Sequence, residues 1–370
     1  MSIDALRLHS LQIPLVRPFR TSFGTQHVRD VMLVEAIDSD GAQGWGECVT
    51  LGWPGYNAEY TAGAIQVIKE YLAPIVLGKD WNPDGVHAGM EVVRGHHIAR
   101  ASVGTAVLDV WLRRASTSLG EYLGATRAEV DCGVSVGIPT SESIEELLEE
   151  VGMYVDAGYR RIKLKIEPGW DIEPVAAVRE RWPTIPLQVD ANQAYSREHA
   201  HHLARLDEFD LLLIEQPLEE EDWWGHTLIA RACSTPICLD ESILSTESAE
   251  SAIEFGAASN INIKPGRVAG FLEAKKIHDL CLSREVPVWC GGMLETGIGR
   301  AANVALAALP GFTLPGDTSA SNRYYAEDVT EPFVLRDGRL AVPTGPGIGV
   351  VPIPENLRSM AVAVEELTSS

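Results

Sequence analysis

Five charged residues in the middle of the chain recur at nearly equal intervals. Lys165, Asp190, Glu215, Asp240 and Lys264 are separated by 25, 25, 25 and 24 residues, and each ends a short apolar run. In a β/α barrel, equal spacing brings such residues to the same height on successive strands, at the carboxyl ends where barrel active sites lie. The spacing therefore predicts a parallel β/α barrel in which three carboxylates converge between two flanking lysines.

The chain after residue 130 supports a barrel, because strand-like runs occur eight times and helical segments lie between most of them. The runs are Cys132–Ile138, Ile162–Ile166, Leu187–Asp190, Leu211–Glu215, Ile237–Asp240, Ile261–Lys264, Val286–Cys290 and Phe312–Leu314. Eight strands make a complete barrel. We therefore expect an α/β fold whose barrel occupies residues 126–325.

Residues 1–125 have a different pattern, which predicts a separate α+β domain. Residues 5–15 and 31–37 alternate like strands, and residues 59–123 have helical periodicity. The segments 17–24 and 51–56 are rich in Gly, Pro and aromatic residues, so we expect loops, the first with two exposed phenylalanines, that act as lids over a site.

The last part of the chain, residues 326–370, contains a stretch rich in Pro and Gly and then a predicted helix over residues 357–367. The eight barrel strands are complete before this tail begins. We therefore expect the tail to pack back onto the first domain.

The charge balance limits the partners of the protein. The 370 residues include 30 basic and 52 acidic side chains, for a formal charge of −22, which argues against nucleic acid and anionic membranes. The six cysteines form no C-x-x-C pair, so we expect them to be reduced. The sequence shows no signal peptide and no apolar run near the ~18 residues of a membrane helix. We expect a cytoplasmic protein.

Lys163 and Lys165 lie two residues apart in one predicted strand, so their side chains share a face. Lysines on an edge strand also serve to block unwanted pairing, but the carboxylates that follow at regular intervals favour a functional site. Three clustered carboxylates repel one another unless a cation joins them. An all-oxygen set suits Mg²⁺ or Mn²⁺, so we predict Asp190, Glu215 and Asp240 as metal ligands.

Two lysines beside such a metal predict proton transfer on a carboxylate substrate. The metal and Lys163 would stabilise an enediolate while a neutral lysine removes the α-proton and its counterpart delivers a proton to the other face. Crowding near other cations lowers a lysine pKa, which permits a lysine base near neutral pH. Glu241 directly follows Asp240 and is expected to point away, in a supporting role.

These motifs resemble those of the enolase superfamily, in its muconate-lactonizing-enzyme-like subgroup, and are most similar to the N-acylamino acid racemase / o-succinylbenzoate synthase family. The resemblance covers nearly the whole chain, including Pro18–Gly24. The matching motifs are Lys163-Leu-Lys165, Val189-Asp-Ala-Asn192, Ile214-Glu-Gln-Pro217, Leu239-Asp-Glu-Ser242, Asn262-Ile-Lys-Pro-Gly-Arg267, Trp289-Cys-Gly-Gly-Met-Leu-Glu-Thr-Gly297 and Gly316-Asp-Thr-Ser-Ala-Ser321.

The resemblance implies a modified (β/α) barrel with a capping domain built from the N-terminal part and the C-terminal tail. It implies Lys165 and Lys264 as the acid/base pair. It also implies pocket residues on the barrel and on the closing loops: Ser135, Lys163, Asn192 and Met293, and Phe19, Phe23 and Tyr56. Arg267 is associated with racemase competence in this family. Relatives often carry a glutamate at the position of Gly104.

The leading prediction is an N-acylamino acid (N-succinylamino acid) racemase that uses Mg²⁺ or Mn²⁺ and no organic cofactor, acts on a small-molecule carboxylate and forms a homo-oligomer. An o-succinylbenzoate synthase, which performs a syn-dehydration in menaquinone biosynthesis, shares the same intermediate, so the sequence does not separate the two. A Schiff-base lysine aldolase would leave the three carboxylates unexplained. A non-catalytic barrel is the remaining alternative and predicts no turnover.

Overall fold

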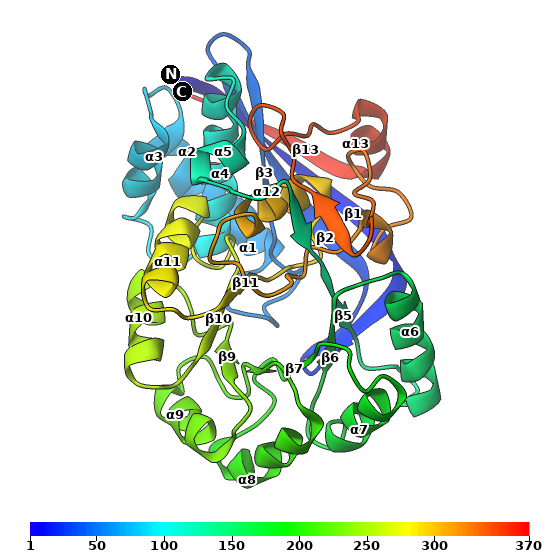
Figure 1. Ribbon diagram of the computed structural model, residues 1–370. Helices are drawn as coiled ribbons and strands as arrows, with labels where there is room; N and C mark the ends of the chain where they lie inside the picture. The colour runs from blue at the N-terminus through cyan, green and yellow to red at the C-terminus, as the bar shows by residue number, and fades with distance from the viewer. Residues whose placement is uncertain (370) are drawn as a thin grey trace.

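The computed structural model describes residues 1–369 and has two parts (Figure 1). One part is a four-stranded antiparallel sheet with helices, formed by the start and the end of the chain. The other is a curled seven-stranded parallel sheet with helices on its outside. The expected barrel with an α+β capping domain is confirmed. Among the described residues, no helix is both long and apolar enough to cross a membrane.

The antiparallel sheet has the strand order β13-β1-β2-β3. Its strands are β1 (Ile3–Thr21), β2 (Gly24–Asp38), β3 (Gln43–Cys48) and β13 (Ala361–Thr368). Alternate apolar residues such as Leu6, Leu8 and Val34 are buried in the core of this domain, which is the pattern that predicted strands over residues 5–15 and 31–37.

The loop predicted over residues 17–24 is mostly strand. β1 continues to Thr21, so only two residues remain for the turn before β2. Phe19 is 4% exposed and belongs to the barrel core, so its predicted exposure is wrong. The reason is a contact between the two parts: the Ile138 N–H donates a hydrogen bond to the Arg20 carbonyl (3.0 Å). The tip of the β1–β2 hairpin therefore lies on the parallel sheet.

Helices fill most of residues 61–123. They are α1 (Thr61–Val67), the π-helical η1 (Ile68–Leu72), α2 (Ala73–Val76), α3 (Pro83–Met90), α4 (His97–Arg114) and α5 (Leu119–Leu123). The long helix α4 lies directly on β3, where a Cβ atom added to Gly46 would lie 2.1 Å from the Ser102 carbonyl oxygen. Gly44 makes a similar close approach to Ala106. These two glycines therefore allow the helix to pack on the strand.

We expect alanine substitutions at Gly46 and Gly104 to change stability in opposite directions. Gly104 lies inside α4, and the nearest atom to a new Cβ would be the flexible Met90 Cε at 3.4 Å, so Gly104→Ala should raise the free energy of unfolding by up to about 1 kcal/mol. Gly46→Ala forces β3 and α4 apart and should lower it by roughly 1–3 kcal/mol. Urea denaturation measures both. A less stable Gly104→Ala protein would contradict this account of the helix.

The parallel sheet has the order β11-β10-β9-β8-β7-β6-β5. Its strands are β5 (Gly133–Val136), β6 (Arg161–Lys165), β7 (Leu187–Asp190), β8 (Ile214–Glu215), β9 (Ile237–Leu239), β10 (Asn260–Ile263) and β11 (Val288–Cys290). The helices of this part are α6 (Ile144–Asp156), α7 (Ile172–Arg181), η2 (Arg197–His199), α8 (Ala200–Leu203), η3 (Ala204–Phe209), α9 (Trp223–Ala232), α10 (Thr246–Glu254), α11 (Phe271–Ser283), α12 (Gly297–Ala307) and η4 (Ser321–Arg323). Each strand overlaps one of the first seven predicted runs.

The predicted eighth strand, residues 312–314, is wrong. Phe312 forms only an isolated bridge to Val288, and Gly316 forms another to Cys132. This extended segment lies between β11 and β5 and closes the barrel without a regular strand. Pro315, in the middle of the segment, has no N–H to give to a ladder, which accounts for the interruption.

The helix predicted over residues 357–367 is correct only at its start. The tail first contributes β12 (Arg339–Ala341), which pairs with β4 (Glu129–Asp131). Then α13 (Pro354–Met360) leads into β13, which pairs antiparallel with β1 from Ala5–Thr368 to Leu11–Ala361. The edge of β1 presents backbone N–H and C=O groups that need partners. A neighbouring strand can pair with them and a helix cannot, so residues 361–368 form a strand. The tail thus completes the antiparallel sheet.

Glu47 of β3 joins the two parts of the molecule. Its carboxylate accepts hydrogen bonds from Thr296 Oγ1 (2.7 Å) and the Gly299 N–H (2.9 Å) at the start of α12. Burial, followed by the nearby charge of Glu295, raises the pKa of Glu47 to about 7. The folded protein therefore holds a proton here that the unfolded chain releases at lower pH.

This raised pKa predicts that stability falls as the pH rises. Between pH 4.5 and about 7 the folded state binds more protons at Glu47 than the unfolded state, so the free energy of unfolding decreases across that window. The shift corresponds to about 3 kcal/mol. We expect the stability difference between the wild type and Glu47→Gln to change by about this amount between pH 4 and pH 8. Urea denaturation at both pH values measures it, and a constant difference would refute the prediction.

Candidate active site

The five regularly spaced charged residues lie at one end of the parallel sheet. Lys165, Asp190 and Glu215 end β6, β7 and β8 and are direct register partners. Asp240 and Lys264 follow the last residues of β9 and β10. All five are at most 8% exposed. The equal spacing in the sequence therefore corresponds to neighbouring positions at the carboxyl ends of five adjacent strands.

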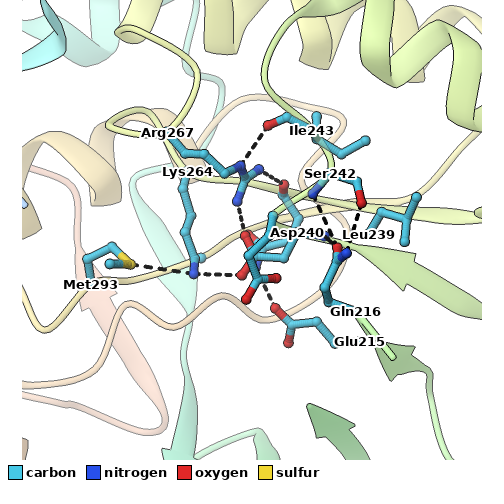
Figure 2. Close-up of polar contacts among 12 residues, drawn as sticks. Glu215, Gln216, Leu239, Asp240, Ser242, Ile243, Lys264, Arg267 and Met293 are labelled. Atoms are coloured by element: carbon cyan, nitrogen blue, oxygen red, sulfur yellow. Dashed lines mark hydrogen bonds and ion pairs between the residues drawn. The ribbon is translucent and has the colours of Figure 1, made fainter. Parts of the chain in front are cut away.

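Lys165 and Lys264 each contact one of these carboxylates. Lys165 Nζ lies 2.6 Å from Asp190 Oδ2, and Lys264 Nζ lies 2.7 Å from Asp240 Oδ2. Asp240 also contacts the Arg267 guanidinium, and Figure 2 shows Lys264 and Arg267 pointing toward it from different sides. The negative charges at the strand ends are thus balanced by buried cations.

Lys163 lies deeper among the acidic groups. Its Nζ is 3.0 Å from Glu215 Oε2, 3.2 Å from Asp190 Oδ2 and 2.7 Å from Asp317 Oδ2. It lies 4.7 Å from the ring centroid of Trp289. The sequence reasoning assigned no role to Asp317. Asp317 lies three residues after the eighth predicted run, and a carboxylate so close to a strand end was the signal that could have indicated it.

The buried charges shift pKa values in different directions. Burial alone would raise the pKa of Asp190, but the Lys165 ammonium group holds it well below its usual range. Burial and then the charge of Asp190 raise the pKa of Glu215. Burial lowers the pKa of Lys165, whereas Tyr56 and acidic neighbours outweigh burial at Lys264 and raise its pKa. The pKa values of the two lysines are therefore shifted in opposite directions.

A cavity lies where the capping domain meets the strand ends. Its walls include every residue that the resemblance placed in the pocket, and both lysines of the predicted pair: Phe19, Phe23, Tyr56, Ser135, Lys163, Lys165, Asn192, Lys264 and Met293. Thr21 and Leu51 of the two segments expected as lids also line it. Five further lining residues were not predicted: Gln26, Gly292, Leu294, Asp317 and Tyr324. Residues from both parts of the molecule thus form one cavity.

The two segments expected to act as lids both reach this cavity. Tyr56 Oη donates a hydrogen bond to Asp240 Oδ1 (3.1 Å) and accepts one from Lys264 Nζ (3.1 Å). The rings of Phe23 and Tyr56 are 6.4 Å apart between centroids. The capping domain therefore contributes a polar group at the strand ends as well as aromatic walls.

Glu241 points toward the charged cluster, which contradicts its expected direction. Asn192 Nδ2 donates to Glu241 Oε1 (3.0 Å), and Asn192 Oδ1 accepts from Lys165 Nζ (2.7 Å). Burial, followed by the charge of Asp190, raises the pKa of Glu241 to about 7. Because β9 ends at Leu239, the alternation of a strand no longer sets the direction of this side chain.

Arg267 lies outside the cavity lining and is 2% exposed. It donates hydrogen bonds to the carbonyl oxygens of Ile243 and Asn262 (2.6 Å each), and the first of these is visible in Figure 2. Asn262 Nδ2 in turn donates to Glu215 Oε1 (2.7 Å). Arg267 therefore holds the loop after β9 and the end of β10 around Asp240.

The chemistry of Asp190, Glu215 and Asp240 fits a hard divalent cation. They offer carboxylate oxygens alone, which Mg²⁺ and Mn²⁺ prefer, and the effect of Asp190 on the pKa of Glu215 is a repulsion that a cation would relieve. Within residues 1–369, no three His, Cys, Asp or Glu side chains are grouped as a metal site. In this arrangement ammonium groups contact the three carboxylates.

Comparisons with known proteins cover the whole molecule. The sequence model of the family described as enolase C-terminal domain-like matches residues 146–356. The sequence model of the mandelate racemase / muconate lactonizing enzyme N-terminal domain matches residues 5–124. An N-succinylamino acid racemase from Amycolatopsis sp is 56% identical over 365 residues, 98% of each chain. An o-succinylbenzoate synthase from Geobacillus kaustophilus is 44% identical over 351 residues, 94% of this chain and 93% of that one. A crystal structure of an enolase superfamily member from Listeria innocua matches with a TM-score of 0.94 at 41% identity, over 100% of this chain and 99% of that one.

Proposed function

Because the chain belongs to the enolase superfamily, in its mandelate racemase / muconate lactonizing enzyme family, we propose that it racemises N-acylamino acids by proton transfer between two lysines. The relatives named N-succinylamino acid racemase support an N-succinylated amino acid as the substrate. The substrate carboxylate would lie at the strand ends, and its α-carbon between Lys165 and Lys264.

The observation that carries this proposal is the placement of two buried lysines on one cavity. Lys165 ends β6 and Lys264 follows β10, so three strands of the curled sheet separate them. Both line the same cavity. Such a pair can address two faces of one α-carbon, which is the requirement for inversion.

Each lysine has a defined part in the proposed reaction. A neutral Lys165 removes the α-proton, and the electrons of the C–H bond move into the carboxylate to form an enediolate. The Lys264 ammonium group then delivers a proton to the opposite face, which leaves the inverted amino acid, Lys165 protonated and Lys264 neutral. The reverse reaction exchanges the two roles. The lowered pKa of Lys165 and the raised pKa of Lys264 support the first assignment.

Asp190, Glu215 and Asp240 would hold the Mg²⁺ or Mn²⁺ ion. The bound ion would supply positive charge that stabilises the enediolate. Lys163, whose pKa is raised by Asp317 and its other acidic neighbours against the effect of burial, remains an ammonium group and adds positive charge at the same place. Phe19, Phe23 and Tyr56 would contact the side chain or acyl group of the substrate.

An o-succinylbenzoate synthase is the second candidate. The relatives named o-succinylbenzoate synthase favour it. In that reaction Lys165 would start the elimination of water, and Lys264 would stabilise the enediolate by its charge alone. The same cavity and the same cations serve both reactions.

The experiment that tests the proposal follows deuterium exchange at the α-carbon. The protein is incubated with Mg²⁺ in D₂O with each enantiomer of N-succinylphenylalanine, and in parallel with the cyclohexadiene substrate of the synthase. Exchange and inversion from both enantiomers support racemisation. Turnover of the cyclohexadiene alone would show that the protein is an o-succinylbenzoate synthase and not a racemase. Trapping of a substrate on lysine by borohydride would indicate a Schiff-base aldolase instead.

A further inference from the structure

The two lysines differ in whether the capping domain gives them a hydrogen-bond partner. Lys165 Nζ contacts Asp190 Oδ2 (2.6 Å) and Asn192 Oδ1 (2.7 Å), both of which belong to the barrel. Lys264 Nζ contacts Asp240 Oδ2 (2.7 Å) in the barrel and Tyr56 Oη (3.1 Å) in the capping domain. The capping domain therefore contributes a hydrogen-bonding partner to Lys264, while the two oxygen partners of Lys165 come from the barrel.

We propose that Tyr56 is a positioning residue for Lys264, so that one hydroxyl group of the capping domain favours proton transfer at one face of the substrate more than at the other. The proposal rests on the two-lysine function described above. It assigns to Tyr56 a role beyond lining the cavity, and it makes the two half-reactions unequal in their dependence on the segment 51–56.

The contacts of Tyr56 define how it acts. Its hydroxyl donates to Asp240 Oδ1 (3.1 Å) and accepts from Lys264, so one group ties the carboxylate to the ammonium. Lys264 Nζ also lies 4.5 Å from the centroid of the Tyr56 ring. Met293 Sδ, at 3.6 Å, is a much weaker partner. Without the hydroxyl, Lys264 keeps a single oxygen partner on a flexible four-carbon stem.

The position of Tyr56 is well determined. It is 5% exposed and packs in the core of the capping domain, with Phe23 beside it. The same residue lines a wider hollow at the mouth of the cavity, together with Ser22, Asn57 and Asn192. The segment that lines this hollow therefore also supplies a hydrogen-bond partner to Lys264.

A residue that only lined the cavity would behave differently. Loss of a wall contact would raise KM for both enantiomers by similar factors, because both occupy the same cavity. Loss of a lysine partner would lower the exchange rate at saturating substrate for the enantiomer whose exchange depends on that lysine. The ratio of the two exchange rates therefore separates the two roles.

The test measures exchange in D₂O with the Mg²⁺-loaded protein and each enantiomer of N-succinylphenylalanine. Lys165→Ala and Lys264→Ala first identify which enantiomer depends on which lysine. Tyr56→Phe keeps the ring and removes the hydroxyl, and we expect it to change the ratio of the two exchange rates by about tenfold, against the Lys264-dependent enantiomer, which is the rate equivalent of one hydrogen bond. Phe23→Leu, which alters the same wall without removing a polar group, should leave the ratio within about twofold.

Equal losses for both enantiomers in Tyr56→Phe, or a loss confined to the Lys165-dependent enantiomer, would overturn the proposal. Crystal structures of Mg²⁺-loaded wild type and Tyr56→Phe give a readout that needs no turnover. We expect Lys264 to move or to take more than one conformer while Lys165 stays in place, and an unchanged Lys264 would also overturn the proposal. If the wild type exchanges neither enantiomer, the proposed function fails, and the position of Lys264 still decides the role of Tyr56.

Discussion

Lys165→Ala should abolish α-proton exchange in one enantiomer of an N-succinylamino acid, and Lys264→Ala should abolish it in the other. Each lysine is the general base for one face in the proposed reaction, and removing such a base lowers the rate by about 10²–10⁴-fold. Racemisation needs both faces, so each variant should lose inversion entirely. Proton NMR in D₂O measures exchange, and polarimetry or chiral chromatography measures inversion.

The control for these variants is Lys275→Ala. Lys275 is a lysine of α11 paired with Asp279 (2.5 Å), and its side chain is partly exposed, so its loss should leave both exchange rates unchanged. If Lys165→Ala and Lys264→Ala both retain exchange of both enantiomers, the two-base mechanism is wrong. If each variant loses all exchange of both enantiomers, the lysines do not act on separate faces.

Removal of divalent cations should also eliminate turnover. Treatment with EDTA, followed by its removal, should reduce exchange by about 10³-fold or more, because the charge stabilisation that a metal ion gives to the enediolate is worth several kcal/mol. Addition of Mg²⁺ or Mn²⁺ should restore the rate. Glu215→Gln removes one negative charge from the predicted ligand set and should require a higher metal concentration for half-maximal activity.

Glu180→Gln is the matched control for Glu215→Gln, because Glu180 is an exposed carboxylate of α7. We expect its metal dependence to equal that of the wild type. Full turnover by protein in which elemental analysis detects no divalent metal would contradict the ligand assignment. The same result would favour a mechanism in which Lys163 and its neighbouring cations alone stabilise the enediolate.

The sequence predicted the barrel well because spacing along the chain determines the height of a residue on a parallel sheet. Lys165, Asp190 and Glu215 are register partners for this reason. It predicted irregular segments less well. Residues 312–314 have the composition of a strand, but Pro315 interrupts the ladder, and residues 361–367 form a strand because the edge of β1 is available.

The sequence also failed to predict the direction of two side chains. Glu241 was expected to point away from the site, but β9 ends before it, so it turns toward Asn192. Phe19 was expected at the surface, but the hairpin that carries it lies on the barrel and buries it. In both cases a contact between separate segments replaced the local pattern that the expectation relied on.

The sequence by itself determined the barrel and its five regularly spaced charged residues, because a repeated spacing is a local property that every strand–helix unit enforces. Only the tertiary structure decided which side chains of the site contact one another. Lys264 and Tyr56 are 208 residues apart and meet because the capping domain docks on the strand ends. Lys163 meets Asp317 through closure of the barrel. These contacts depend on how two surfaces from distant parts of the chain pack together. The periodicity of the sequence within each segment contains no information about that packing.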